Sequence, residues 1–399
     1  MSVTEVSEQG WFSRMKDAII GVLVGILMFF AAGGMLFYNE YDALYRANDL
    51  AEAEKVVISV QADKVDSANQ GKLVHMSAKA VTEDTLKDTT FGITQPKTLK
   101  LSRDVEMFQW DEKVTTKTEK KTGGKKVTTK TYSYEKKWSS SVISSSSFKE
   151  SGHTNPTSMR YSSESWMAKK VNLGAFTLTS GQVGSIGGWA DIAPSEATTI
   201  PSGGVVEGNT IYFRAPGTTG ESVGDLRVTF KAVGPKDISI YAGQTGDTFE
   251  EFKTSVGHIS HMRLDMGTLS AKAMFDAAKS EAAMLKWILR FVGFVLMFIG
   301  VGMVFRPFEV MADIIPFIGN IVGMGIGILA FAIAAPSALF TIAVAWLIFR
   351  PFYGIILMAM GIGIFVGIYK MASGKKAAAP AAAAPPVPSD ATPPPVPGA

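Results

Sequence analysis

The feature that most constrains this chain is the placing of its four apolar segments. One stands alone near the N-terminus and three crowd together near the C-terminus, at residues 18–38, 287–305, 321–349 and 352–369. A helix that crosses the hydrocarbon core of a bilayer needs about 20 predominantly apolar residues, and each segment reaches or approaches that length. Because the stretch between the first two segments is polar, the sequence predicts an integral membrane protein with one large water-facing domain, residues 41–285.

The first apolar segment has two interpretations. Arg14 and Lys16 precede it, as basic residues precede the apolar core of a secretory signal peptide. A signal peptide has a shorter core that ends at small residues, whereas this run continues to Tyr38, although the small residues 31–34 inside it leave cleavage open. We expect a retained span at residues 18–38, preceded by a cytoplasmic segment, residues 1–17.

The basic residues beside the segments predict the orientation. With four spans, Arg14, Arg306 and Lys370 fall on one side of the membrane, and an excess of Lys and Arg marks the cytoplasmic side. Both termini are then cytoplasmic, and residues 41–285 form an extracytoplasmic domain. Residues 306–320 mix proline, glycine and apolar side chains, which predicts an interfacial cytoplasmic loop.

Two features near the C-terminus have alternative interpretations. Pro336 divides segment 321–349, which is either one kinked span or two half-spans. Neighbouring helices can satisfy the carbonyl that a proline frees, so we expect one span kinked near residue 336. Residues 370–399 are an Ala/Pro-rich cytoplasmic tail, expected to be disordered. Its proline runs predict a linker, or a ligand for a polyproline-binding cytoplasmic partner.

The polar domain is predicted to be rich in β-strand. Residues 105–110 alternate, residues 127–134 are β-branched and aromatic, and Gly123-Gly124 lies midway between them, which predicts a long hairpin. Further strands are expected at residues 56–61, 72–80, 210–214, 226–233 and 238–241. From about residue 270 to 285 apolar residues recur at helical spacing after Ser270, a plausible N-cap, so a stalk helix should continue into the span at 287–305. The predicted fold class is membrane α-helical, with four transmembrane helices, plus a large β-rich (α+β) extracytoplasmic domain inserted between spans 1 and 2.

The register of the hairpin follows from its aromatic residues. All have even numbers, so they share one face only if paired residues sum to an even number: Phe108, Trp110, Tyr132, Tyr134 and Trp138. A two-residue loop at Gly123-Gly124 gives an odd sum, so we expect a three-residue loop or a bulge, with Trp110 and Trp138 buried. The lysines near the tip predict a solvated, outward-facing end that protects the edge, or a contact with lipid headgroups.

Several short motifs occur in the order seen in one family of membrane proteins. They are Gly71-Lys72-Leu73-Val74-His75, Val105-Glu106-Met107-Phe108-Gln109-Trp110, Tyr132-Ser133-Tyr134 with Trp138, Gly152-His153-Thr154-Asn155-Pro156, Gly224-Asp225-Leu226-Arg227-Val228 and Phe349-Arg350-Pro351. In these motifs and in the layout of its spans the chain resembles the LUMA family, transmembrane protein 43, from about residue 11 to 370. It departs from the family at Tyr41-Asp42, where members usually have Gly and a basic residue.

The resemblance implies a four-span protein that acts as a scaffold in contact with other membrane proteins. It implies structural roles for His75, Glu106, Trp110, Trp138, His153, Asn155, Pro156, Asp225 and Arg227. Animal members are associated with the endoplasmic reticulum and inner nuclear membrane, where the domain would be lumenal. The Ala/Pro tail suggests instead a bacterial member in the inner (plasma) membrane, with a periplasmic domain.

The residue types that carry catalysis or bind cofactors form no persuasive pattern. Cysteine is absent, which excludes thiolate metal ligands and thiol nucleophiles. Only His258 and His261 lie close together among the histidines, with no third ligand nearby, so a structural role is favoured. A net charge of +3 does not indicate nucleic-acid binding. We expect no enzymatic activity, no cofactor and no metal site.

Small residues in the spans predict close helix packing. They recur at four-residue spacing as Gly21 and Gly25, as Gly319, Gly323 and Gly327, and as Gly363 and Gly367. Such spacing lets helix backbones approach, within one chain or between subunits. Since no charged residue lies in the middle of a span, we expect a non-enzymatic multi-pass scaffold that organises protein complexes in the membrane. Its expected partners are membrane lipids, other membrane proteins and further copies of itself; the alternative is a channel or transporter component.

Overall fold

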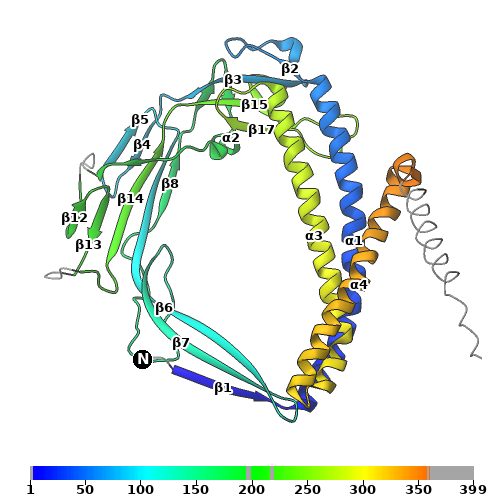
Figure 1. Ribbon diagram of the computed structural model, residues 1–399. Helices are drawn as coiled ribbons and strands as arrows, with labels where there is room; N and C mark the ends of the chain where they lie inside the picture. Colours follow the sequence, from blue (N-terminus) through cyan, green and yellow to red (C-terminus); the bar gives the residue numbers. More distant parts are fainter. Residues whose placement is uncertain (1–2, 195–198, 216–219, 357–358, 360–399) are drawn as a thin grey trace, which may run out of the picture. The chain divides into compact units, whose positions relative to one another are not determined.

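Three long apolar helices dominate the computed structural model, which describes residues 3–194, 199–215, 220–356 and 359 (Figure 1). The helices are α1 (Trp11–Val56), α2 (Ser180–Ser185), α3 (Ala271–Ala312) and α4 (Pro316–Phe349), with a short 3-10 helix at Ser67–Asn69. Of these, α1, α3 and α4 are long and apolar enough to cross a membrane. The predicted fourth span and tail, residues 352–369 and 370–399, lie almost entirely outside the described residues.

The chain divides into two compact units, Met1–Thr341 and Ile342–Ala399, and every contact described below lies within the larger one. The predicted stalk and second span are one unbroken helix, α3, whose first turn is capped by the Ser270 hydroxyl accepting from the N–H of Ala273 at 3.2 Å. α4 continues through Pro336 as one helix. Residues 306–320, predicted as an interfacial loop, are instead the last turns of α3, a short turn and the first turn of α4.

The region between α1 and α3 is built from strands, so the β-rich domain is confirmed. The strands are β1 (Val3–Gln9), β2 (Ile58–Ser59), β3 (Leu73–Val81), β4 (Thr85–Asp88), β5 (Ile93–Pro96), β6 (Lys100–Lys121), β7 (Lys125–Ser139), β8 (Glu164–Met167), β9 (Val171–Leu173), β10 (Phe176–Leu178), β11 (Ala190–Ile192), β12 (Gly204–Glu207), β13 (Thr210–Phe213), β14 (Leu226–Val233), β15 (Lys236–Thr245), β16 (Thr248–Glu250) and β17 (Arg263–Met266). One sheet runs β1-β7-β6-β14-β13-β12, with β8 beside β6 and β11 beside β14. A second runs β10-β9-β3-β15-β16, with β2 beside β3 and β17 beside β15, and β4 pairs with β5.

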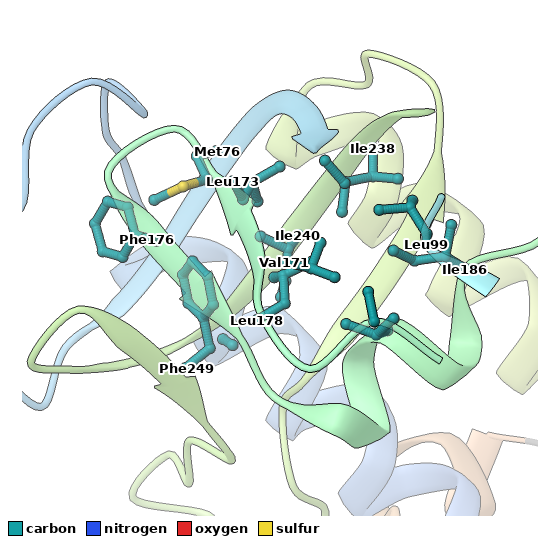
Figure 2. Close-up of a cluster of buried hydrophobic side chains, with 14 of the residues drawn as sticks. Met76, Leu99, Val171, Leu173, Phe176, Leu178, Ile186, Ile238, Ile240 and Phe249 are labelled. Atoms are coloured by element: carbon teal, nitrogen blue, oxygen red, sulfur yellow. The ribbon is translucent and has the colours of Figure 1, made fainter. Parts of the chain in front are cut away.

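Alternating apolar residues give each sheet its own core. In the second sheet Met76 of β3 and Ile240 of β15 point to the same side as Phe176 and Phe249, whose rings stack at 5.1 Å (Figure 2). The first sheet buries Phe91 against Phe230 and its neighbours. A third cluster joins the second sheet to the helices, where Tyr241 stacks on Phe275 of α3 at 4.5 Å. Burial raises the pKa of Tyr241 to about 12.

α1 and α3 form an antiparallel pair, held by polar contacts near the domain and by close packing of apolar and small residues beyond them. Near the domain, Glu54 of α1 pairs with Lys279, and Glu40 accepts both hydrogen bonds of the Arg290 guanidinium at 2.7 and 2.9 Å. Between these contacts and the far end, α1 presents small residues to α3, and Leu36 packs with Met297. The two helices therefore start from the domain and run side by side to the opposite end, at Trp11 and Ala312.

The long hairpin has the predicted register. Lys121 pairs with Lys125 and Phe108 with Trp138, so partners sum to an even number and the loop is the three residues 122–124. Gly123 and Gly124 adopt φ values of +82° and +72°, which residues with a Cβ rarely adopt. The burial prediction was wrong in degree, because Trp110 and Trp138 are half-buried.

The surroundings of the hairpin differ from those expected. Residues 1–17, expected to be a cytoplasmic N-terminal segment, supply β1, which pairs antiparallel with β7 from Val3 opposite Tyr132 to Gln9 opposite Lys126. The hairpin tip, expected to be solvated and to face outward, lies against the ends of α1 and α3 that are distant from the domain (Figure 1). We call residues 110–136, the outer part of the β6–β7 hairpin, the arm.

Candidate functional site

At the base of the arm, loops and side chains continue the hydrogen bonding to β6 where the neighbouring strand β14 ends. β14 stops pairing with β6 at Met107, opposite Leu226. Beyond that point the N–H of Phe108 donates to Asp225 O and Phe108 O accepts from the N–H of Gly224, both at 2.9 Å. Next, the Asn155 side chain accepts from the N–H of Trp110 at 2.7 Å and donates to Trp110 O at 2.9 Å. An amide side chain thus pairs with β6 as a neighbouring strand would.

Around this base the predicted motif residues pack as an aromatic cluster. His153 stacks on Tyr134 with ring centroids 4.0 Å apart and meets the edge of Trp110 at 4.5 Å. Its Nδ1 is buried and has no hydrogen-bond partner within the described residues. The motif Gly152-His153-Thr154-Asn155-Pro156 therefore attaches the preceding loop to both strands of the arm.

A polar group lies on the same face of the sheet, next to the aromatic cluster along the strands. Glu106 accepts from Arg227, its cross-strand partner, at 2.6 Å, and the Arg227 guanidinium lies 4.7 Å from the centre of the Trp138 ring. Asp225 is buried and accepts from the N–H groups of Ser222 and Ala215 at 2.7 and 3.2 Å. Together with Pro156, which lies beside Gly224, these residues fix the point where the arm leaves the sheet.

His75 lies apart from the other motif residues, in the second sheet. Its Nε2 is 2.9 Å from Leu269 O and its Nδ1 is 3.3 Å from the Ser59 hydroxyl, so it connects β3 to the start of α3. Burial lowers the pKa of His75, which favours the neutral ring. His258 and His261 each face a separate carboxylate of α1, Asp42 at 2.9 Å and Asp49 at 2.8 Å. No group of three potential metal ligands occurs in the described part of the chain.

The tip of the arm closes onto the far end of the helix pair. The Trp11 indole N–H donates to Val310 O at 2.8 Å, and the N–H of Gly123 donates to Ile314 O at 3.0 Å. Lys120 donates to Glu309 at 2.8 Å and to Asp313 at 2.9 Å.

Arg14 completes this contact from α1. It pairs with Asp313, which is fully buried, and donates to Gly124 O at 2.7 Å. Although burial acts to lower the pKa of Lys120, its hydrogen bonds to Glu309 and Asp313 outweigh that effect and raise it. The buried carboxylate of Asp313 therefore has two cationic partners, Arg14 of α1 and Lys120 of β6.

The candidate glycines occupy three kinds of position. Gly25 contacts the backbone of α3, because a Cβ built there would lie 2.5 Å from Gly300 O, and Gly21 lies near Met303. Gly319 and Gly323 face the chain's own Asp313 and Glu309, whereas Gly327 has open space beside it. Gly363 and Gly367 lie outside the described residues.

The tip residues Trp11, Glu309 and Asp313 were missed by the sequence analysis. A signal was present, since Glu309 and Asp313 are the two acidic residues between Glu281 and Asp390 and stand among apolar residues. Isolated charges beside apolar segments are expensive to bury and usually have a specific partner. That partner is more than 180 residues away, so no local pattern reveals it.

Comparisons with known proteins agree with the motif order. The family model described as Transmembrane protein 43 matches residues 107–351. The chain is 29% identical to the Homo sapiens protein "Transmembrane protein 43" over 374 residues, which cover 91% of this chain and 92% of that protein. It is 30% identical to the Rattus norvegicus protein of the same name, covering 90% and 91%, and 27% identical to "Transmembrane protein 43 homolog" of Drosophila melanogaster, covering 86% and 93%. No solved structure matches the chain.

Proposed function

Because the chain belongs to the transmembrane protein 43 family, we propose that this multi-pass membrane protein is a non-enzymatic scaffold that works as a homo-oligomer. In this proposal the β-rich domain binds other membrane proteins outside the cytoplasm. Its location would be the periplasmic side of a bacterial inner membrane, or the lumenal side of the endoplasmic reticulum or inner nuclear membrane in a eukaryote.

The observation that carries the proposal is the course of the arm beside the helices. The arm leaves the domain that follows Val56, at one end of α1, and its tip reaches Trp11, at the other end. Between these ends lies the apolar segment 18–38, about 30 Å long at 1.5 Å per residue. The arm therefore extends over the depth of the bilayer that this segment would cross.

The arm is too polar to face lipid at that depth. Residues 111–121 include Asp111, Lys113, Lys117 and Glu119, and β1 adds further carboxylates. Non-helical backbone with charged side chains is tolerated at bilayer depth only inside protein or beside water. Helices from several copies of the chain, arranged around their arms, would provide such surroundings, and this is why we favour an oligomer.

The outer surface of the helices supports the same arrangement. Large apolar side chains are exposed on α1 and α4, among them Leu27 at 71%, Phe30 at 70% and Ile328 at 69%. Among the described residues, nothing lies within 4 Å of a Cβ built at Gly327, which is beside Ile328. Such faces suit lipid and the helices of neighbouring copies.

Paired cysteines test whether the arm and the N-terminal strand meet in the membrane. The chain contains no cysteine, so Val6→Cys with Thr129→Cys, which are partners in β1 and β7, introduces one defined pair. We expect an oxidant to cross-link this pair within one chain in native membranes. The matched control is Val6→Cys with Lys117→Cys, because Lys117 pairs with Thr129 from the opposite side and β7 separates it from Val6.

The same samples test the oligomer. After extraction into nanodiscs, the cross-linked protein should have a particle mass of several chains. Absence of the cross-link would contradict the observed position of the arm beside β1. A cross-linked particle with the mass of one chain would contradict the proposed oligomer.

A channel or transporter component is the second candidate, favoured by the same polar arm. A charged ribbon at bilayer depth is also what a hydrated path through the membrane would contain. The scaffold proposal predicts that reconstituted protein conducts no more than a protein-free bilayer. A conductance that changes with Lys113→Glu would favour the channel.

A further inference from the structure

A cationic cavity lies where the tip of the arm meets the helices. It has a volume of about 320 Å³, and four of its lining residues are basic: Arg14, Lys120, Lys126 and Arg306. They come from the start of α1, both strands of the arm and the last turns of α3. The cavity therefore exists only when the arm is closed onto the helix pair.

Internal pairing leaves two of these cations available. Arg14 and Lys120 share the carboxylate of Asp313, and Lys120 also bonds to Glu309. Lys126 and Arg306 form no ion pair or side-chain hydrogen bond with the described residues. Asp17, at the rim, accepts from Gln9 at 2.6 Å. Lys126 and Arg306 are thus opposed by one carboxylate, Asp17, so the cavity keeps an excess of positive charge while its base is neutralised by Glu309 and Asp313.

The surroundings of the cavity are those of a membrane surface. The apolar segment of α1 begins at residue 18, directly after Asp17, and that of α3 ends at Phe305, directly before Arg306. Three aromatic side chains near this end of the helices are exposed: Phe12 at 84%, Phe308 at 55% and Phe317 at 74%. Exposed phenylalanines beside basic residues suit the boundary between the hydrocarbon and the headgroups.

We propose that this cavity binds the phosphate group of an anionic membrane lipid, with Arg306 and Lys126 as its direct partners. A guanidinium can donate two parallel hydrogen bonds to phosphate oxygens, and a lysine ammonium adds a charge that turns freely. The volume is sufficient for a phosphate with part of a glycerol, while the acyl chains lie along the apolar helices. Because Lys126 belongs to the arm and Arg306 to α3, the bound lipid also holds the arm closed.

Native mass spectrometry of the full chain in detergent tests this site, with phosphatidic acid as the probe because its phosphate is a monoester. We expect one phosphatidic acid to be retained per chain, while phosphatidylcholine is lost at the same concentration. The double variant Lys126→Gln with Arg306→Gln should lower retention by about a hundredfold, since each charge-assisted hydrogen bond contributes about tenfold. The swapped variant Lys126→Arg with Arg306→Lys should keep most of it.

The matched control is Lys87→Gln with Lys169→Gln, which removes two exposed lysines of the domain and should leave retention unchanged. Equal retention by the neutral variant, or equal loss in the control, would overturn the proposed site. Displacement of the lipid by an equal concentration of inorganic phosphate would also overturn it, because the cavity would then hold a soluble anion. Loss of retention in the swapped variant, which keeps both charges and one guanidinium, would also overturn it.

Discussion

Asn155 is the residue on which the base of the arm most depends. It is 5% exposed, and its amide forms three hydrogen bonds, two with the backbone of Trp110 and one with Ile143 O at 3.0 Å. Removing the side chain would leave the N–H and C=O of Trp110 unpaired next to a half-buried aromatic cluster. Buried groups without a partner destabilise a protein more than the lost bond alone would suggest.

We predict that Asn155→Ala lowers the free energy of unfolding of the domain by about 2 kcal/mol or more. Urea unfolding of the detergent-solubilised chain, followed by tryptophan fluorescence, would measure it. Asn209→Ala is the control, since Asn209 is exposed in a turn and its truncation should change stability by less than about 0.5 kcal/mol. Identical midpoints for the two variants would mean that Asn155 does not support the arm.

Among the elements, the α1–α3 pair depends on one close crossing. Gly25 and Gly300 face each other, and a Cβ on either would lie within 2.7 Å of a backbone oxygen of the partner helix. Neither backbone can move aside without separating the helices. The spacing of Gly21 and Gly25 thus serves packing within the chain, which is one of the two roles that the sequence left open.

We predict that Gly25→Leu lowers the midpoint of thermal unfolding by about 5 °C or more, because overpacking of a close contact costs about 3 kcal/mol. The measurement is a melting curve of the detergent-solubilised protein. Gly34→Leu on the same helix is the control, since nothing lies within 4 Å of a Cβ at Gly34. A Gly25→Leu protein as stable as this control would contradict the observed crossing.

The helices and strands also show which structural features can be predicted from the sequence. The parity of Phe108 and Trp138 predicted the three-residue loop, because the side chains of a strand alternate with a period of two residues. Likewise Ser270 marked the start of α3, because capping depends on neighbours within one turn. The closed tip was not predictable in this way, since Lys120 looks like any solvated lysine until Glu309 and Asp313 are brought beside it.

At the scale of the whole molecule, β1 and the tip of the arm form one sheet and must therefore lie in the same compartment. Residues near the 3-10 helix Ser67–Asn69, such as Lys64, lie beyond the other end of α1. If α1 crosses the membrane, these two regions are exposed to opposite compartments. The arm then brings residues of the β-rich domain to the side of the membrane on which the N-terminus lies.

Single cysteines can show this directly, because the parent chain has none. We predict that Ser7→Cys and Thr122→Cys react together with a membrane-impermeant maleimide, and that Lys64→Cys reacts only from the opposite side. Intact and permeabilised cells would be compared by the mass shift of the labelled protein. Labelling of Thr122→Cys together with Lys64→Cys, and apart from Ser7→Cys, would show that the arm is open in the membrane.

The ion pair between Arg14 and Asp313 also sets the order in which this chain can fold. Its two residues are 299 positions apart, and Lys120 lies between them in the sequence, 193 positions before Asp313. During synthesis β1 and the arm are made before α3. The contact with Asp313 forms only once the last turns of α3 exist, because the entropy cost of closing so long a loop is not offset before that contact is made. The pairing of α1 with α3 shortens that loop beforehand, so we expect the tip to close only after these two helices have paired.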